Sequence, residues 1–155
     1  MMILKILFKF VIVVLLLTNL SGCNTTGLKE TDDAPNNDLL ALREEADFAY
    51  LNDDLVTSAK HYETLVREIP EEASHWFRLA NIYVRTNRPD AAIDLYREAL
   101  IRDPKFSKAW YNMGIVQLKQ TAFSLNEMLV YTDRYDPLYS KAARMLEEIK
   151  AIIKE

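Results

Sequence analysis

The chain has little of what disulfide-bonded, metal-binding or phosphate-binding proteins need. A single cysteine among 155 residues excludes a disulfide within the chain. The three glycines, Gly22, Gly27 and Gly114, do not form a phosphate-binding loop with a following lysine. The two histidines, His61 and His75, have no histidine or cysteine partner at metal-ligand spacing. We therefore expect no metal and no cofactor, and we expect both histidines on the surface or in a groove.

The sequence also lacks a basic face. The formal net charge is −4, and Lys and Arg alternate with Asp and Glu along the chain, whereas nucleic-acid binding requires cations gathered on one side. The adjacent glutamate pairs at 44–45, 71–72 and 147–148 point apart on a helix, so they do not form a catalytic carboxylate pair. We expect no catalytic residues and no enzyme, although residues distant in sequence can still meet in space.

The first 22 residues have the pattern of a secretory signal peptide. Lys5 and Lys9 precede an unbroken apolar run at 10–17. That run is shorter than the roughly 20 apolar residues of a membrane-spanning helix. A signal-anchor is the alternative interpretation.

The residues at the end of this leader resemble the lipobox of bacterial lipoproteins: Leu20, Ser21, Gly22 and Cys23. The resemblance implies that the Cys23 thiol receives diacylglycerol, that cleavage makes it the first mature residue, and that a further acyl chain such as palmitate is added. Two or more chains hold a protein on a membrane stably. The alternative is a free thiol, buried or reactive, at Cys23.

The following residue and the next segment suggest where the mature protein lies. In enteric bacteria the resemblance implies that Asp after the cysteine retains a lipoprotein in the inner membrane, so Asn24 indicates the periplasmic face of the outer membrane. The inner membrane remains open. From 24 to 37 the chain is polar and contains Asn, Thr, Gly, Asp and Pro, which predicts a flexible tether at 23–37 with a reach of about 20 Å.

Beyond Asp38 the sequence repeats itself with a fixed period. The recurring positions, all separated by the same interval, are Tyr62 and Tyr96, Pro70 and Pro104, Trp76 and Trp110, and Ala46, Ala80 and Gly114. Within the central unit, aromatic and small residues recur at helical spacing, which places them on one face of each helix. Asn87 and Arg88 predict the turn between two helices, and Pro89 suits the first turn of the second helix.

The segment 73–104 resembles the tetratricopeptide repeat (TPR) closely, through Trp76, Leu79, Ala80, Tyr83, Ala92, Tyr96, Ala99 and Pro104. The resemblance implies an all-α, right-handed solenoid of helix pairs. We predict a TPR domain at 38–155 with three repeats at 39–72, 73–106 and 107–137 and a capping helix at 138–154. Ser107 is the expected N-cap of the third unit. The register of that unit's second helix stays open, because Leu125 and Thr132 stand where small residues are expected.

In TPR stacks the first helices of successive pairs line a concave groove, which the resemblance carries over to specific positions here. The predicted partner-binding groove consists of Arg43, Asp47, Tyr50, Leu51, Phe77, Asn81, Val84, Arg85, Tyr111, Ile115, Leu118 and Lys119. It is apolar and aromatic with charged edges, which suits an extended peptide or an inserted helix. A clamp for a C-terminal carboxylate is not expected, because only Arg43 and Asn81 match that pattern. Packing against the tether or a neighbouring helix is the alternative use of the groove aromatics.

Four functions remain at this level. The favoured hypothesis is a lipid-anchored scaffold or assembly factor for an envelope machine, similar in layout to TPR lipoproteins of pilus, secretin or outer-membrane assembly. The second is an adaptor for peptidoglycan hydrolases or other cell-wall enzymes. An enzyme and a self-associating structural protein are the other two, and the oligomeric state stays open.

Overall fold

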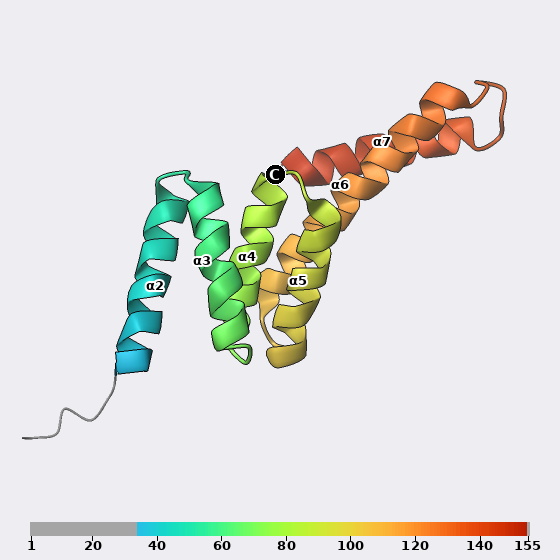
Figure 1. Cartoon of the computed structure of the whole chain (residues 1–155). Coiled ribbons are helices and arrows are strands. Elements are labelled where there is room, and N and C mark those ends of the chain that lie inside the picture. The colour runs from blue at the N-terminus through green and yellow to red at the C-terminus, as the bar shows by residue number, and fades with distance from the viewer. Residues whose placement is uncertain (1–33, 155) are drawn as a thin grey trace, which may run out of the picture. The chain divides into compact units, whose positions relative to one another are not determined.

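The computed structural model describes residues 34–154, and all its regular structure is helical (Figure 1). The helices are α2 (Ala34–Leu51), α3 (Leu55–Glu68), α4 (Ala73–Arg85), α5 (Pro89–Arg102), α6 (Ser107–Tyr131) and α7 (Tyr139–Lys154). The predicted leader, Cys23 and most of the predicted tether lie outside the described residues. The tether prediction was too long at its end, because α2 already begins at Ala34. Pro35 does not prevent this, since proline is tolerated in the first turn of a helix.

The first two helix pairs share one turn geometry. Asp53 and Asn87 hold equivalent positions in the two repeats, and both adopt the left-handed conformation, with φ of 64° and 57°. Asp and Asn tolerate this conformation better than most residues with a side chain. Each turn is followed by a helix start, with the Asp54 carboxylate accepting from the Thr57 backbone N–H and with Pro89 in the first turn of α5. These turns let two antiparallel helices pack against each other.

The core is built from small residues where helices approach and from tyrosines that fill the remaining space. Ala46, Ala80 and Ala92 are completely buried, and the tyrosines of the two second helices, Tyr62 and Tyr96, are almost completely buried. Because alanine has only a methyl side chain, α4 and α5 approach closely at Ala80 and Ala92. The predicted all-α TPR fold is thus confirmed in its packing as well as its helix content.

The two repeat tryptophans play matching roles at the edge of this core. The indole N–H of Trp76 donates to the Pro70 carbonyl at 2.8 Å, and that of Trp110 donates to the Pro104 carbonyl at 3.0 Å. Each tryptophan therefore holds the start of a first helix against the proline that closes the preceding repeat. The guanidinium of Arg102 lies 4.3 Å from the centre of the Trp76 ring, which adds a cation–π contact.

The third unit differs from the prediction, because α6 continues without a turn for 25 residues (Figure 1). The place that Asp53 and Asn87 occupy in the earlier units holds Thr121, a β-branched residue that strongly disfavours positive φ. Phe123 stands where Pro89 starts the second helix of the central unit. With no residue to make the turn, the helix continues to Tyr131.

The length of α6 changes how the C-terminal segment pairs with the rest of the repeats. Instead of a complete pair at 107–137 followed by a separate cap, α6 and α7 together form the third pair, and α7 folds back along α6 (Figure 1). The predicted N-cap was displaced by one residue, since Phe106 occupies the N-cap and Ser107 is the first helical residue. Within residues 34–154 no helix has both the length and the apolar character needed to cross a membrane.

Replacing Ala92 by Leu is expected to lower the free energy of unfolding by about 1 to 3 kcal/mol, because the larger side chain has no space between α4 and α5. Urea denaturation monitored by circular dichroism measures this change. Ala41→Leu, at an exposed position of α2, is the matched control and should leave stability nearly unchanged. Equal effects of the two substitutions would contradict the proposed close packing.

Candidate functional site: a hollow beside the repeat helices

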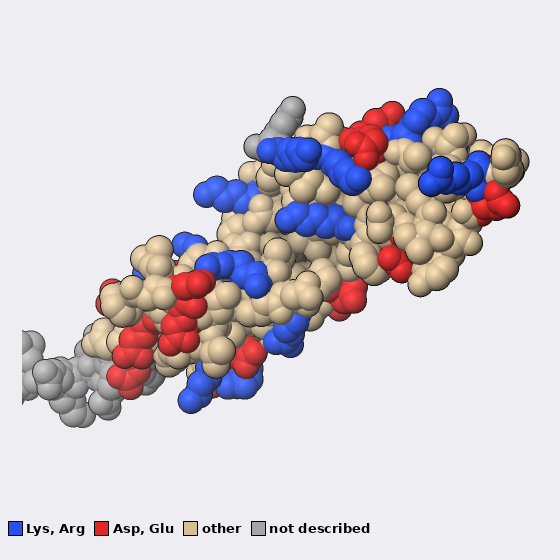
Figure 2. Space-filling model, turned by 90° about the horizontal axis from the view of Figure 1, so that it is seen from above, with Lys and Arg blue, Asp and Glu red and all other residues tan. Residues whose placement is uncertain are grey.

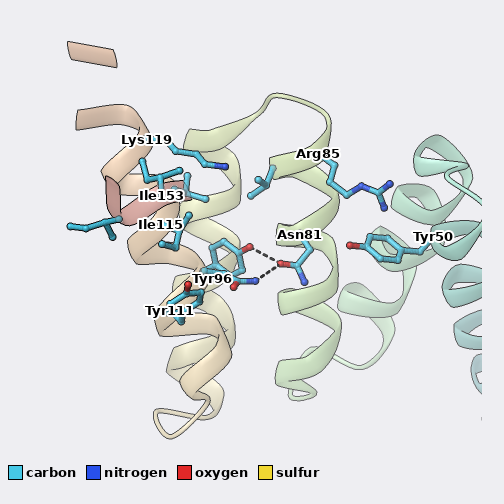
Figure 3. A pocket seen from close by; sticks show the side chains of 12 residues that line it. Tyr50, Asn81, Arg85, Tyr96, Tyr111, Ile115, Lys119 and Ile153 are labelled. Carbon is cyan, nitrogen blue, oxygen red and sulfur yellow. Dashed lines mark hydrogen bonds between the residues drawn. The ribbon is translucent and has the colours of Figure 1, made fainter. Parts of the chain in front are cut away.

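A hollow of about 360 Å³ opens beside the first helices of the second and third pairs (Figure 3). It is lined by residues from α2, α4, α5, α6 and α7: Tyr50, Asn81, Val84, Arg85, Tyr96, Tyr111, Asn112, Ile115, Val116, Lys119, Ile152 and Ile153. The lining combines aromatic rings, branched aliphatic side chains, two amides and two cations. We call this site the hollow below.

Asn81 lies at the centre of the polar part of the hollow. Its Oδ1 accepts a hydrogen bond from the Tyr96 hydroxyl at 2.6 Å and another from Asn112 Nδ2 at 2.9 Å, so it joins α4, α5 and α6 (Figure 3). Burial raises the pKa of Tyr96 to about 12, so its hydroxyl stays protonated and donates at neutral pH. The Asn81 side chain is therefore fixed in orientation by two donors.

The sequence period explains how the hollow changes from one repeat to the next. In the first pair the Tyr62 hydroxyl donates to Asp47 Oδ1 at 2.6 Å, which repeats the Tyr96 to Asn81 contact. In the third unit the Asn81 position holds Ile115. The hydrogen-bonded pair is thus absent there, and Ile115 presents an aliphatic side chain to the hollow instead.

The hollow has two cations: Arg85 on α4 extends toward Tyr50, and Lys119 on α6 lies on the side of Ile115 and Ile153 (Figure 3). The Arg85 guanidinium lies 4.7 Å from the centre of the Tyr50 ring and forms an ion pair with Asp53. Both partners of that pair are partly exposed, so the pair stabilises the fold little and can exchange with another carboxylate.

The structure brings seven of the predicted groove residues together. Tyr50, Asn81, Val84, Arg85, Tyr111, Ile115 and Lys119 all line the hollow. Tyr111 is 68% exposed, so its ring is not used for packing within the fold.

The other predicted groove residues lie elsewhere. Phe77 packs into the core, with its ring centre 5.9 Å from that of Tyr96 and 4.8 Å from that of Phe106. Asp47 accepts from Tyr62 and lies 3.7 Å from the Nε of Arg78. Arg43 and Leu51 are exposed on α2 and Leu118 is half-buried on α6, all outside the lining of the hollow.

Sequence reasoning missed five lining residues: Tyr96, Asn112, Val116, Ile152 and Ile153. The helical period of the sequence predicted Tyr96 between two helices. It did not indicate that the Tyr96 hydroxyl also reaches the hollow. Nothing in the sequence indicated that Ile152 and Ile153 would line the hollow, because their position depends on α7 folding back along α6.

The histidines separate into one partly exposed and one buried residue. His61 Nε2 lies 3.9 Å from Glu45 at the surface. His75, expected on the surface or in a groove, is instead only 4% exposed, and its Nδ1 has no hydrogen-bond partner. It packs against the first helix pair, where its ring centre lies 6.2 Å from that of Tyr62. Among residues 34–154 no group of three or more His, Cys, Asp or Glu side chains is arranged to hold a metal ion.

Antiparallel helix pairs that recur at a fixed period, with a hollow along their first helices, define a helical-repeat scaffold that binds other proteins. The sequence profile of the tetratricopeptide repeat family matches residues 49–105 and 77–127, which together span half of the chain. The chain belongs to the tetratricopeptide repeat family.

A solved structure supports the same fold. The Yersinia enterocolitica type III secretion translocator chaperone SycD is similar with a TM-score of 0.55 and 17% sequence identity, over 77% of this chain and 88% of that chain. At this identity the likeness concerns the fold alone. No curated protein has a sequence that matches the chain.

The buried His75 should make stability depend on pH. Burial lowers the pKa of His75 below 6.5, with Arg43 lowering it further and Glu72 and Asp47 opposing the shift. As the pH falls, His75 therefore binds a proton in the unfolded chain before it does so in the folded chain. The contribution of His75 to the free energy of unfolding is complete above pH 6.5. It declines as the pH falls below 6.5 toward the lowered pKa of the folded state.

Urea denaturation from neutral pH down to about pH 5 should show this loss, and His75→Phe should reduce it. Phenylalanine keeps an aromatic ring beside Tyr62 without a titrating group. His61→Gln is the matched control, because His61 lies at the surface in contact with Glu45. An unchanged pH dependence in His75→Phe would contradict the assignment.

Proposed function

We propose that this chain is a membrane-anchored scaffold or assembly factor that binds a protein segment in the hollow and serves an envelope machine for pilus, secretion or outer-membrane assembly. The observation that carries the binding function is the hollow itself, in which seven residues predicted from the repeat pattern line one concave site. The exposed ring of Tyr111 and the fixed amide of Asn81 offer apolar and polar contacts side by side.

The chemistry of the lining favours binding over catalysis. Its hydrogen-bonding groups are tyrosine hydroxyls, asparagine amides and two cations, and its members include neither a carboxylate nor a histidine that could act as a general base. The raised pKa of Tyr96 keeps that hydroxyl a donor. We therefore propose that the chain has no enzymatic activity.

The membrane part of the proposal rests on the leader and on Cys23. The apolar run, the lipobox-like residues and the polar segment that follows suit a lipid-anchored protein whose repeats stand off the bilayer. Asn24 after the cysteine favours the periplasmic face of the outer membrane.

A photo-crosslinking amino acid at Tyr111 in the full chain should capture an envelope-assembly protein in its host membranes. The same amino acid at Ile101, which is exposed on α5 outside the hollow, should not capture that protein. Mass spectrometry of the crosslinked products identifies the partner.

The identity of the captured protein distinguishes the functions. An envelope-assembly component crosslinked at Tyr111 alone supports the proposal. Capture of peptidoglycan hydrolases at Tyr111 would instead support the function of a cell-wall adaptor. Equal capture from Tyr111 and Ile101, or no capture at Tyr111, would overturn binding in the hollow.

Cells grown with an alkyne analogue of palmitate should label the protein, and Cys23→Ser should abolish the label because serine offers no thiol for lipid attachment. The unlabelled variant should also move from the membrane fraction to the soluble fraction, or retain its uncleaved leader. Persistent labelling of Cys23→Ser would refute lipidation at this residue. Density-gradient separation of the two membranes then tests the outer-membrane location.

A further inference from the structure

The hollow has a charge that differs from the rest of the molecule. The chain as a whole carries a net charge of −4, yet the hollow is lined by two cations, Arg85 and Lys119, and by no aspartate or glutamate. Seen from above, Lys and Arg side chains gather over the middle of the molecule, and Asp and Glu side chains gather toward the α2 end (Figure 2). The two cations, with no carboxylate in the lining, attract an acidic ligand group to the hollow.

The two cations are available in different ways. Lys119 forms no ion pair with any residue in the described part of the chain, and its ammonium group points toward the hollow (Figure 3). Arg85 is held in place by the face of the Tyr50 ring, while its partner Asp53 is largely exposed and lies outside the lining. A carboxylate that enters the hollow can thus meet Lys119 directly, whereas at Arg85 it competes with Asp53.

The side of the hollow that carries Lys119 also has branched aliphatic side chains. Ile115 and Val116 come from α6, and the end of α7 adds Ile152 and Ile153. Ile152 remains 52% exposed, so its apolar surface is only partly covered by the fold. Burying this surface beneath a ligand's aliphatic side chain would be favourable.

We propose, building on the binding function proposed above, that the hollow takes a protein segment in which branched aliphatic side chains lie next to an aspartate or glutamate. The aliphatic side chains contact Ile115, Val116, Ile152 and Ile153, and the carboxylate pairs with Lys119, which comes from the same helix as Ile115 and Val116. The acidic group is a side chain within the segment and no free C-terminus is required. The end of α7 therefore belongs to the binding site together with α6.

Selection of short random peptides on the full chain, purified in detergent, tests this specificity. Peptides that bind should be enriched in Asp or Glu beside Ile, Leu or Val. Lys119→Glu should weaken their binding about tenfold and shift selection toward Lys and Arg. Lys108→Glu changes the net charge equally at an exposed position of α6 outside the hollow, and it should leave the selected sequences unchanged.

The role of the aliphatic side chains Ile115, Val116, Ile152 and Ile153 is tested with the peptides that the unmodified chain selects. Ile153→Ala should weaken them about tenfold, because half-buried aliphatic surface is lost. Ile101→Ala, an exposed α5 position outside the hollow, should have no effect. Circular dichroism of each variant verifies the helical fold.

The outcomes separate this inference from the function on which it rests. Peptides that compete with crosslinking at Tyr111 but show no acidic preference, or keep it in Lys119→Glu, overturn the specificity and leave binding in the hollow intact. If Tyr111 captures a partner but no selected peptide competes with that capture, the specificity alone fails. If Tyr111 captures no partner, the binding function fails as well. Acidic, aliphatic peptides that invert their charge preference with Lys119→Glu support both.

Discussion

The close approach of antiparallel helices at small residues is the constraint on which the rest of the structure depends. Ala80 and Ala92 bring α4 and α5 together, and Tyr96 fills the space beside them. Because the same tyrosine extends its hydroxyl to Asn81, the contact that closes the core also fixes a polar group in the hollow. The core and the polar part of the hollow are therefore made by the same side chains.

Much of the fold followed from the sequence because its determinants are local and periodic. Alanines, tyrosines and prolines at fixed spacing indicate helix pairs without knowledge of distant contacts. The third unit was misjudged because the closing Pro137 was given weight while the turn position was not. Thr121 stands where Asp53 and Asn87 make turns, and its β-branched side chain was a readable signal that α6 continues.

The site was predictable to the extent that it lies on the first helices. The TPR resemblance predicted Asn81, Tyr111 and their neighbours as groove residues, and these side chains line the hollow. It also predicted Phe77, whose ring instead packs in the core against Tyr96 and Phe106. The contribution of α7 was beyond sequence reasoning, because Ile152 reaches the hollow only through the path of a long helical hairpin. The spacing of residues in the sequence determines which of them share one face of a helix. The path of a helical hairpin depends instead on where the chain turns.

The unbroken α6 has a consequence for how such an array can grow. A duplicate of the central unit inserted ahead of α6 would find the same neighbours on both sides, since Trp76 bonds to the proline that closes the unit before it and Trp110 bonds to the proline that closes the central unit. A unit appended after α7 would find no matching neighbour, because the third pair has lost the register that the others share. Lengthening by gene duplication is thus possible ahead of α6 and prevented after α7.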